Sequence, residues 1–400
     1  MTGISTLGQS LNQISRLQEQ QSLLDSLGTQ LATGRKTQVL SGLDTQVTQA
    51  LRSRTSIASL DTYINNITIA ERRTEYTLSA LEQFQEQAEN FAGALAGFMQ
   101  QGAHQLGEPV YFDDPLTPDD VENEFIGYSS AEPDVDLETL QDLASNLFDY
   151  MVDLLNTKDG DRYVFNGADS SNEPFTNSGA LDSAISTALD DWRLENITTA
   201  ELIADLQDRT IDDGNLDALT DTVVGYSSTL SADTAGKVVI RVSEGTEIDA
   251  TVLANDQGIR DVMVALSYFK SADLGPIADE VEIDPVTGLP TVITEGAPGA
   301  NIDEMTDNFY EVFNTLSAMV NSALDDIDQQ RFKLEAARAT IDEIKVSHEN
   351  QRAILQSNVD DIENADINEV AVRINALSTQ LEASYSVTSF IQNLSLVNFL

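Results

Sequence analysis

The last hundred residues carry the most regular hydrophobic pattern in the chain. Residues recur there at alternating spacings of four and three, with one polar member, at Leu316, Val320, Ala323, Ile327, Gln330, Leu334, Ala337, Ile341 and Ile344. This spacing places all nine on one face of a helix and is typical of a coiled-coil seam. A helix from about Asn301 to Lys345 would be on the order of 65 Å long, at about 1.5 Å per residue. We therefore predict a helical rod here.

A second apolar stripe near the other end of the chain keeps the same register less strictly. It comprises Leu60, Ile64, Ile67, Glu71, Thr74, Leu78, Leu81, Gln85, Ala88, Ala92, Leu95 and Met99. Two long stripes can bury each other, so we predict that these helices pack together. All nine prolines lie between Pro109 and Pro298. Because proline breaks helices, its absence from both ends supports long helices there.

Two shorter amphipathic segments lie outside the predicted rod. The first ends near Gly34 and carries Leu7, Leu11, Ile14, Leu17, Leu24, Leu27 and Leu31. The second follows a polar break around Asn364 to Asp366 and carries Val370, Ile374, Leu377, Leu381, Ile391 and Leu394. The last eleven residues are mostly apolar, although chain ends are usually polar. Such a tail either docks on its own domain or is kept for a partner.

The middle of the chain has a mixed pattern. It predicts helices at 137–155 and Ile259–Phe269, strands at Tyr163–Phe165 and Val238–Val242, and an extended loop or irregular hairpin at Pro276–Pro298. The predicted fold is mainly α: a long antiparallel coiled-coil rod from both termini, with a smaller β-rich or mixed outer domain inserted in the middle. Its expected parts are an assembly helix at 1–40 that pairs with 366–400, rod helices at 41–160, the outer domain at 161–245, and return helices and rod at 246–365.

Charge is distributed very unevenly along the chain. The formal net charge is −46, and residues 101–300 alone have 41 acidic and eight basic side chains. This balance argues against nucleic acids and anionic membrane surfaces as partners, since both attract basic residues. It suggests a solvated middle and ends that meet other protein.

The sequence shows neither the pattern of a secretory signal peptide nor that of a membrane-spanning segment. No basic residue precedes an apolar stretch at the start of the chain, and no run of 18 apolar residues occurs. We therefore predict neither a cleaved secretory signal nor membrane insertion. Taken alone, this favours a cytoplasmic protein, unless the chain leaves the cell by a route without a cleaved signal peptide.

Candidate chemistry is sparse. The chain has no cysteine, which excludes disulfides, thiolate metal sites and cysteine nucleophiles. His104 and His348 are far apart, and His348 continues the seam beyond Ile344, so a helix-interface histidine is favoured over a metal ligand. Asp159–Asp161 and Asp212–Gly214 lack the spacing of a calcium loop and are predicted to be solvated turns.

Motifs of known enzyme classes are also missing. Gly236-Lys237 lacks the upstream glycine and the following Ser or Thr of a phosphate-binding loop, and no G-x-S-x-G or G-x-G-x-x-G occurs. The lone Trp192 offers little of the aromatic platform that sugars require. We therefore predict no enzymatic activity, no cofactor and no metal.

Two sequence elements resemble those of a known family. Leu31-Ala-Thr-Gly-Arg-Lys36 is similar to the L-S-[ST]-G-[KLR]-[RK] element of flagellins and hook-associated flagellin homologues. Val359-Asp-Asp-Ile-Glu-Asn-Ala-Asp366 is similar to the I-x-D-A-D stretch that precedes the last helix of this family. Both stand in the expected order and distance from the termini. The resemblance covers roughly residues 1–110 and 300–400.

Three further elements resemble the members of the family that join hook to filament. They are Asn156-Thr-Lys-Asp-Gly-Asp-Arg-Tyr-Val-Phe-Asn-Gly167 followed by Pro174-Phe175, then Ile240-Arg-Val-Ser-Glu-Gly-Thr-Glu-Ile-Asp249, and finally Leu394-Ser-Leu396. The Asn156–Gly167 element leads into the outer domain of that group. Filament flagellins of some bacteria look similar. The resemblance thus implies a junction protein, with filament flagellin as the near alternative and a cytosolic coiled-coil adaptor as the distant one.

The resemblance also implies how such a chain would work. Terminal helices form the inner assembly layer, the rods form the next layer, and the middle faces outward. Partners would be other copies, adjacent flagellar axial proteins and an export chaperone, with export to the extracellular flagellum by the flagellar secretion apparatus. Head-to-tail contacts that do not close generate helical arrays. The expected assembly residues are Leu7, Leu11, Ile14, Leu24, Leu31, Val370, Ile374, Leu377, Leu381, Phe390, Ile391, Leu394, Leu396 and Leu400.

Overall fold

The chain divides into two compact units. The structure, a computed structural model, describes residues 2–101, 107–112, 124–129, 135–176, 179–211, 217–271 and 276–397. The first unit combines Met1–Asn65 with Ile344–Leu400, and the second is Asn66–Glu343. The two longest helices, α2 (Val47–Gln101) and α9 (Ile302–Glu363), each contribute to both units.

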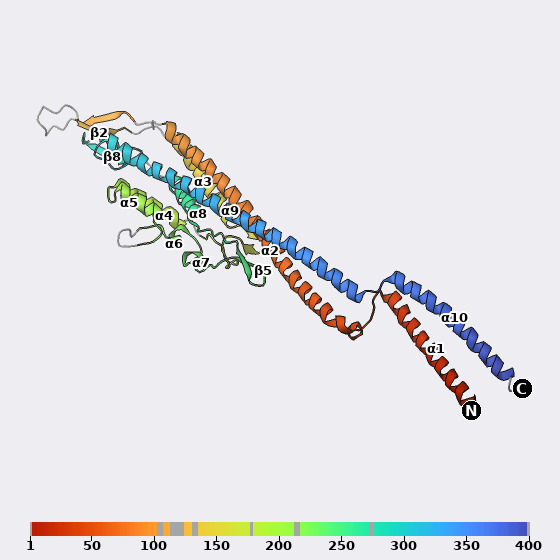
Figure 1. Ribbon diagram of the computed structural model, residues 1–400. Coiled ribbons are helices and arrows are strands. Elements are labelled where there is room, and N and C mark those ends of the chain that lie inside the picture. The colour runs from red at the N-terminus through yellow and green to blue at the C-terminus, as the bar shows by residue number, and fades with distance from the viewer. Residues whose placement is uncertain are drawn as a thin grey trace. The chain divides into compact units, whose positions relative to one another are not determined.

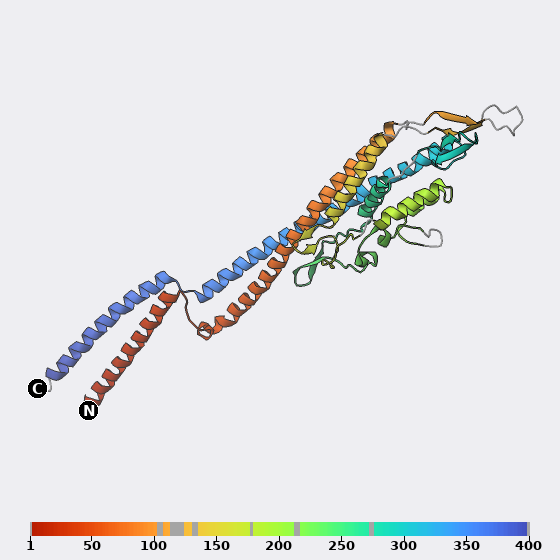
Figure 2. The same cartoon turned by 180° about the vertical axis from the view of Figure 1, so that it is seen from behind.

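In the first unit, helices from the two chain ends lie side by side. Figures 1 and 2 show α1 (Thr2–Thr33) antiparallel to α10 (Ile367–Val397), with both termini at the same end of the pair. A 3₁₀ helix, η1 (Leu40–Gln46), leads into α2. The predicted breaks are confirmed, because α1 ends immediately before Gly34 and residues 364–366 separate α9 from α10.

Helices α2 and α9 pack against each other within each unit. In the first unit, the rings of Tyr63 and His348 lie 5.8 Å apart between centroids, which confirms a helix-interface histidine. In the second unit, the ring of Phe98 stacks on that of Phe313, with their centroids 5.6 Å apart. The predicted pairing of helices from opposite ends of the chain is therefore confirmed.

The seam predicted on α9 is the buried face of that helix. Its apolar members from Leu316 to Ile341 are buried, while Gln330 and Ile344 are half-buried. The helix is longer than the expected Asn301–Lys345, because it continues to Glu363. No proline or glycine interrupts residues 345–363, so nothing in the backbone ends the helix earlier.

Helix α2 buries more of its surface than the predicted stripe. Phe84, Phe91 and Phe98 are fully or almost fully buried, although none belongs to that stripe. The cause is a second neighbouring helix, α8 (Gln257–Lys270). The rings of Phe91 and Phe269 of α8 meet edge to face, with their centroids 5.5 Å apart. Helix α3 (Val135–Leu155) packs on α8 in turn. The predicted helices at 137–155 and Ile259–Phe269 are confirmed by α3 and α8.

A four-stranded sheet in the second unit has the order β1-β2-β7-β8. β1 (Pro109–Phe112) is antiparallel to β2 (Glu124–Tyr128), which pairs in parallel with β7 (Glu280–Ile283) through Tyr128 and Glu280. β7 and β8 (Pro290–Thr294) form an antiparallel hairpin with a register shift between Glu280 and Val281. The irregular hairpin predicted at Pro276–Pro298 is therefore confirmed.

The remaining elements form a mixed α/β region. Two short antiparallel pairs are β3 (Lys158–Asp159) with β4 (Arg162–Tyr163) and β5 (Val239–Ser243) with β6 (Thr246–Asp249). Four helices accompany them: α4 (Gly179–Arg193), α5 (Thr199–Gln207), α6 (Asp221–Val224) and α7 (Ser228–Ser231). The mainly α fold with a mixed middle is thus confirmed, and so is the strand expected at Val238–Val242, which is β5. The sequence pattern had missed α4 to α7, β1, β2, β3 and β6.

Individual predictions in this region have different outcomes. The strand expected at Tyr163–Phe165 ends at Tyr163, and Val164 and Phe165 are buried outside any strand. The turn expected at Asp159–Asp161 is confirmed, with Gly160 at φ +67°. Asp212–Gly214 lies outside the described residues.

Candidate assembly interface

Helices α1 and α10, the terminal pair, meet along a narrow apolar seam. Leu27 of α1 is buried with three residues of α10, and Leu17 and Leu24 pack at its edge. The α10 members recur at spacings of seven and four, at Val370, Leu377 and Leu381. Ile374 and Ala365 are partly buried against the same cluster. Outside this seam, most described positions of both helices are exposed to solvent.

Several large apolar side chains on the terminal pair are exposed. Leu11 and Ile14 continue the stripe of Leu17 and Leu24, yet they are 58% and 50% exposed. Exposed residues that the sequence analysis did not single out are Leu23, Ile367, Val372, Tyr385 and Val387. These side chains give the described part of the terminal pair exposed apolar surface of the kind that protein partners cover.

The expected assembly residues therefore fall into three groups. Those packed between α1 and α10 are Leu24, Val370, Ile374, Leu377 and Leu381. Those exposed are Leu11, Ile14, Leu31 and Phe390, the last at 66%. The side chains of Leu7, Ile391, Leu394, Leu396 and Leu400 lie outside what the structure describes. The described members could serve both to hold the pair and to meet a partner.

Both chain segments break at the same level, in a joint formed by residues 34–36 and 363–366. Backbone hydrogen bonds of 2.8 Å run from Ala365 N to Gly34 O and from Lys36 N to Glu363 O. Between them, Arg35 and Asn364 form an isolated antiparallel bridge. The backbone groups freed by the two helix ends are thus satisfied by each other.

Side chains lock the joint further. Glu363 is buried and forms an ion pair of 2.5 Å with Arg54 of α2, and Lys36 Nζ donates to the carbonyl of Asp361. The Asp366 carboxylate accepts from the backbone N–H groups of residues 368 and 369, at 2.9 and 3.2 Å, and so caps α10. Sequence reasoning missed Arg54 and Glu363, because an ion pair between residues 309 positions apart leaves no local signal.

Gly34 gives the joint a specific test. Its φ of +70° lies in the left-handed region, which costs alanine about 1–2 kcal/mol. We expect Gly34→Ala to speed hydrogen exchange of the Ala365 N–H, which donates to Gly34 O. Gly28→Ala is the matched control, since Gly28 is an exposed helical residue with open space around it and alanine favours helices. Equal exchange rates in both variants would contradict the role of Gly34.

The first unit contains little that suggests chemistry. His348 is buried against Tyr63, and His104 lies outside the described residues. Within the described part of the chain, no three side chains of the metal-binding types gather closely enough to hold an ion. Among the same residues, no helix has the length and apolar character needed to cross a membrane.

Comparison with known proteins assigns part of this interface. Residues 317–400 match the sequence family described as the bacterial flagellin C-terminal helical region. No curated protein sequence matches the chain. One solved structure, assigned as a flagellar hook-associated protein from Vibrio parahaemolyticus, has 10% sequence identity and a TM-score of 0.40, covering 80% of this chain and 97% of that chain. A likeness at that score does not establish a common fold. The match to the flagellin C-terminal helical region therefore extends over most of α9 and over α10.

Proposed function

We propose that the protein is a structural, non-enzymatic subunit of the bacterial flagellum that self-assembles through α1 and α10. The flagellin match at residues 317–400 carries this proposal, because those residues include α10. The exposed apolar side chains of the terminal pair, among them Leu11 and Phe390, supply surface that assembly would bury. A subunit with one such surface on each of its chain ends needs no active site.

Within that role, we propose a hook–filament junction protein of the hook-associated protein 3 type. The element at Asn156–Gly167 and its continuation at Pro174-Phe175 support this, because they form one structural unit. The Asn156 side chain accepts from the Phe175 N–H and donates to the Phe175 carbonyl, each at 3.1 Å. Arg73 of α2 donates to the Gly167 carbonyl at 2.8 Å and anchors the element to the rod. Filament flagellin and a cytosolic coiled-coil adaptor remain the alternatives.

The setting follows from the same proposal. Partners are other copies of this chain, neighbouring axial proteins and an export chaperone, and the site of action is the extracellular flagellum. Export proceeds through the flagellar secretion apparatus without a cleaved signal peptide. Residues 161–245 form the outward domain, and the net charge of −33 in residues 101–300 suits a solvated face.

Charge placed on the exposed terminal residues should prevent assembly. We expect the double variant Leu11→Asp and Phe390→Asp to stay folded but to be missing from assembled flagella. Burying each apolar side chain contributes about 1.5–3 kcal/mol, and burying an unpaired carboxylate opposes association. The measurement is motility, with electron microscopy of the flagella and circular dichroism of the purified protein.

Val286→Asp is the matched control, because Val286 is 90% exposed on the β7–β8 hairpin of the second unit. It adds a negative charge to a residue that is not part of the terminal pair and should assemble normally. Motile cells with normal flagella in the double variant would refute the proposed surface. Purified wild-type protein separates the subtypes, since a filament subunit elongates seeds without limit and a junction protein adds one short layer.

A further inference from the structure

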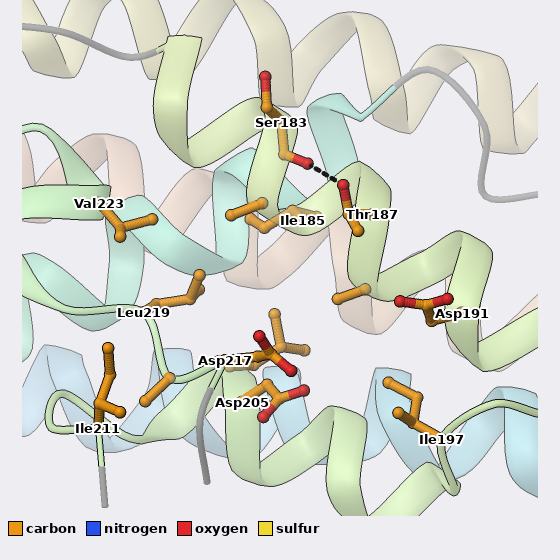
Figure 3. Close-up of a pocket in the computed structure, with 14 residues that line it drawn as sticks. Ser183, Ile185, Thr187, Asp191, Ile197, Asp205, Ile211, Asp217, Leu219 and Val223 are labelled. Atoms are coloured by element: carbon orange, nitrogen blue, oxygen red, sulfur yellow. Dashed lines mark hydrogen bonds between the residues drawn. The ribbon is translucent and has the colours of Figure 1, made fainter.

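A cavity of about 420 Å³ lies among α4, α5 and α6 in the second unit. That volume is within the range of small-molecule sites. Figure 3 shows the carboxylates of Asp205 and Asp217 close together at its centre, with apolar side chains around them. The apolar wall includes Ala184, Ile185, Ala188, Ile197, Leu206 and Leu219. No lysine, arginine or histidine belongs to the lining that the structure describes.

Asp205 is the unusual member of this lining. Asp205 is only 8% exposed, and among the described residues no donor forms a hydrogen bond with its carboxylate. Burial first, and then the charges of Asp217, Glu201 and Asp208, raise the pKa of Asp205 to about 6. A buried carboxylate normally has a hydrogen-bond or ionic partner, because an unpaired one is costly. Among the residues that the structure describes, the lining therefore offers Asp205 no positive charge.

The walls of the cavity are held in place from outside. Arg260 is fully buried and donates to the carbonyls of Leu219, at 2.7 Å, and Asp208, at 2.9 Å. Asp208 directly follows α5, which carries Asp205, and Leu219 is itself part of the cavity lining. In addition, the Leu219 N–H donates to the Asp205 carbonyl at 3.2 Å. These bonds hold the backbone at Asp205 and Leu219 in place before a ligand binds, which lowers the entropic cost of binding.

We propose that this cavity binds a small organic ammonium ion, whose charge is met by Asp205 and whose apolar part lies against Ile185, Ile197 and Leu219. An anion would be repelled by the carboxylates. A bare metal ion would lack ligands, since the described lining offers no cluster of three metal-binding side chains. A neutral apolar molecule would leave Asp205 unpaired. The ammonium group could belong to a free amine or to the side chain of a lysine on another protein.

Calorimetry with n-butylammonium on the full-length protein tests the site. We expect binding at pH 7.5 and at least tenfold weaker binding of 1-butanol, which has the same chain without the charge. Asp205→Asn should weaken n-butylammonium binding at least tenfold. Asp190→Asn is the matched control, because Asp190 is an exposed residue of α4 outside the cavity lining. Ala188→Leu should also abolish binding by filling the space.

Lowering the pH provides a second readout. Protonation of Asp205 removes its charge, so affinity should fall as the pH drops from 7.5 to 5, and this fall should be absent in Asp205→Asn. The other acidic groups facing the site, Asp191, Asp217, Glu201 and Asp208, are present in both proteins. A blocked lysine, Nα-acetyl-lysine methylamide, distinguishes the sources: binding as tight as n-butylammonium indicates a protein side chain, and exclusion indicates a free amine. Equal binding of 1-butanol, undiminished binding by Asp205→Asn, or no binding of n-butylammonium would overturn the proposal.

Discussion

Replacing Phe313 by alanine should lower the free energy of unfolding of the second unit by about 3–5 kcal/mol. Phe313 is fully buried where α2, α8 and α9 meet. Its ring lies 4.5 Å from that of Phe309, 5.0 Å from that of Phe269 and 5.6 Å from that of Phe98, between centroids. Truncation would remove contacts with all three helices at once and leave a cavity that rigid helices cannot close.

Phe332→Ala is the matched control for this variant. Phe332 lies on the same helix, α9, but is 73% exposed, so its truncation should change stability by less than about 0.5 kcal/mol. Urea unfolding followed by fluorescence measures both, because Trp192 is the only tryptophan in the chain and is buried in the second unit. Similar unfolding midpoints for the two variants would show that the aromatic cluster is not the centre of this core.

Replacing Arg260 by methionine should have a comparable effect, about 3–5 kcal/mol. The side chain is completely buried, and burial lowers the pKa of its guanidinium while Asp261, 3.1 Å away, opposes this shift. Methionine preserves much of the volume but leaves Asp261 without its cation. It also leaves the carbonyls of Asp208 and Leu219 without the donors that Arg260 supplies. Buried acceptors without donors cost about 1–3 kcal/mol each.

Arg241→Met controls for the loss of one positive charge. Arg241 lies on β5 with an exposed side chain, and no ion pair is found for it among the described residues. We expect its stability to stay within about 0.5 kcal/mol of wild type. The same Trp192 fluorescence serves here, since both arginines belong to the second unit. If Arg260→Met unfolds at the same urea concentration as Arg241→Met, the buried arginine does not stabilise the loop that it contacts.

Long periodic helices were predictable from the sequence because each repeats the same spacing of apolar residues many times. The α9 seam from Leu316 to Ile341 is buried as its spacing predicted. The stripe on α2 was less accurate, because a sequence stripe assumes one partner and α2 has two. Phe91 contacts that second partner through Phe269, and only the fold brings α8 there.

The candidate sites depend even more on distant residues. The apolar stripe of α1 was evident, but its pattern could not tell that Leu27 is buried while Leu11 is exposed, since both fit the stripe. The Arg54–Glu363 pair joins residues with no local relation. Asp205 was one acidic residue among 67 until the structure placed it in the lining of a cavity, buried and with no donor to its carboxylate among the described residues.

The antiparallel terminal pair also sets an order of events during synthesis. Gln21 of α1 donates to the Tyr385 hydroxyl of α10, 364 residues later in the chain. At roughly 5–20 residues per second, a ribosome needs roughly 20–70 s to make the residues between them. The apolar stripe of α1 therefore emerges long before Val370, Leu377 and Leu381 exist to cover it. Of all the contacts described, those of this pair are the last that the growing chain can form, and a nascent α1 must wait for them unpaired or shielded by another protein.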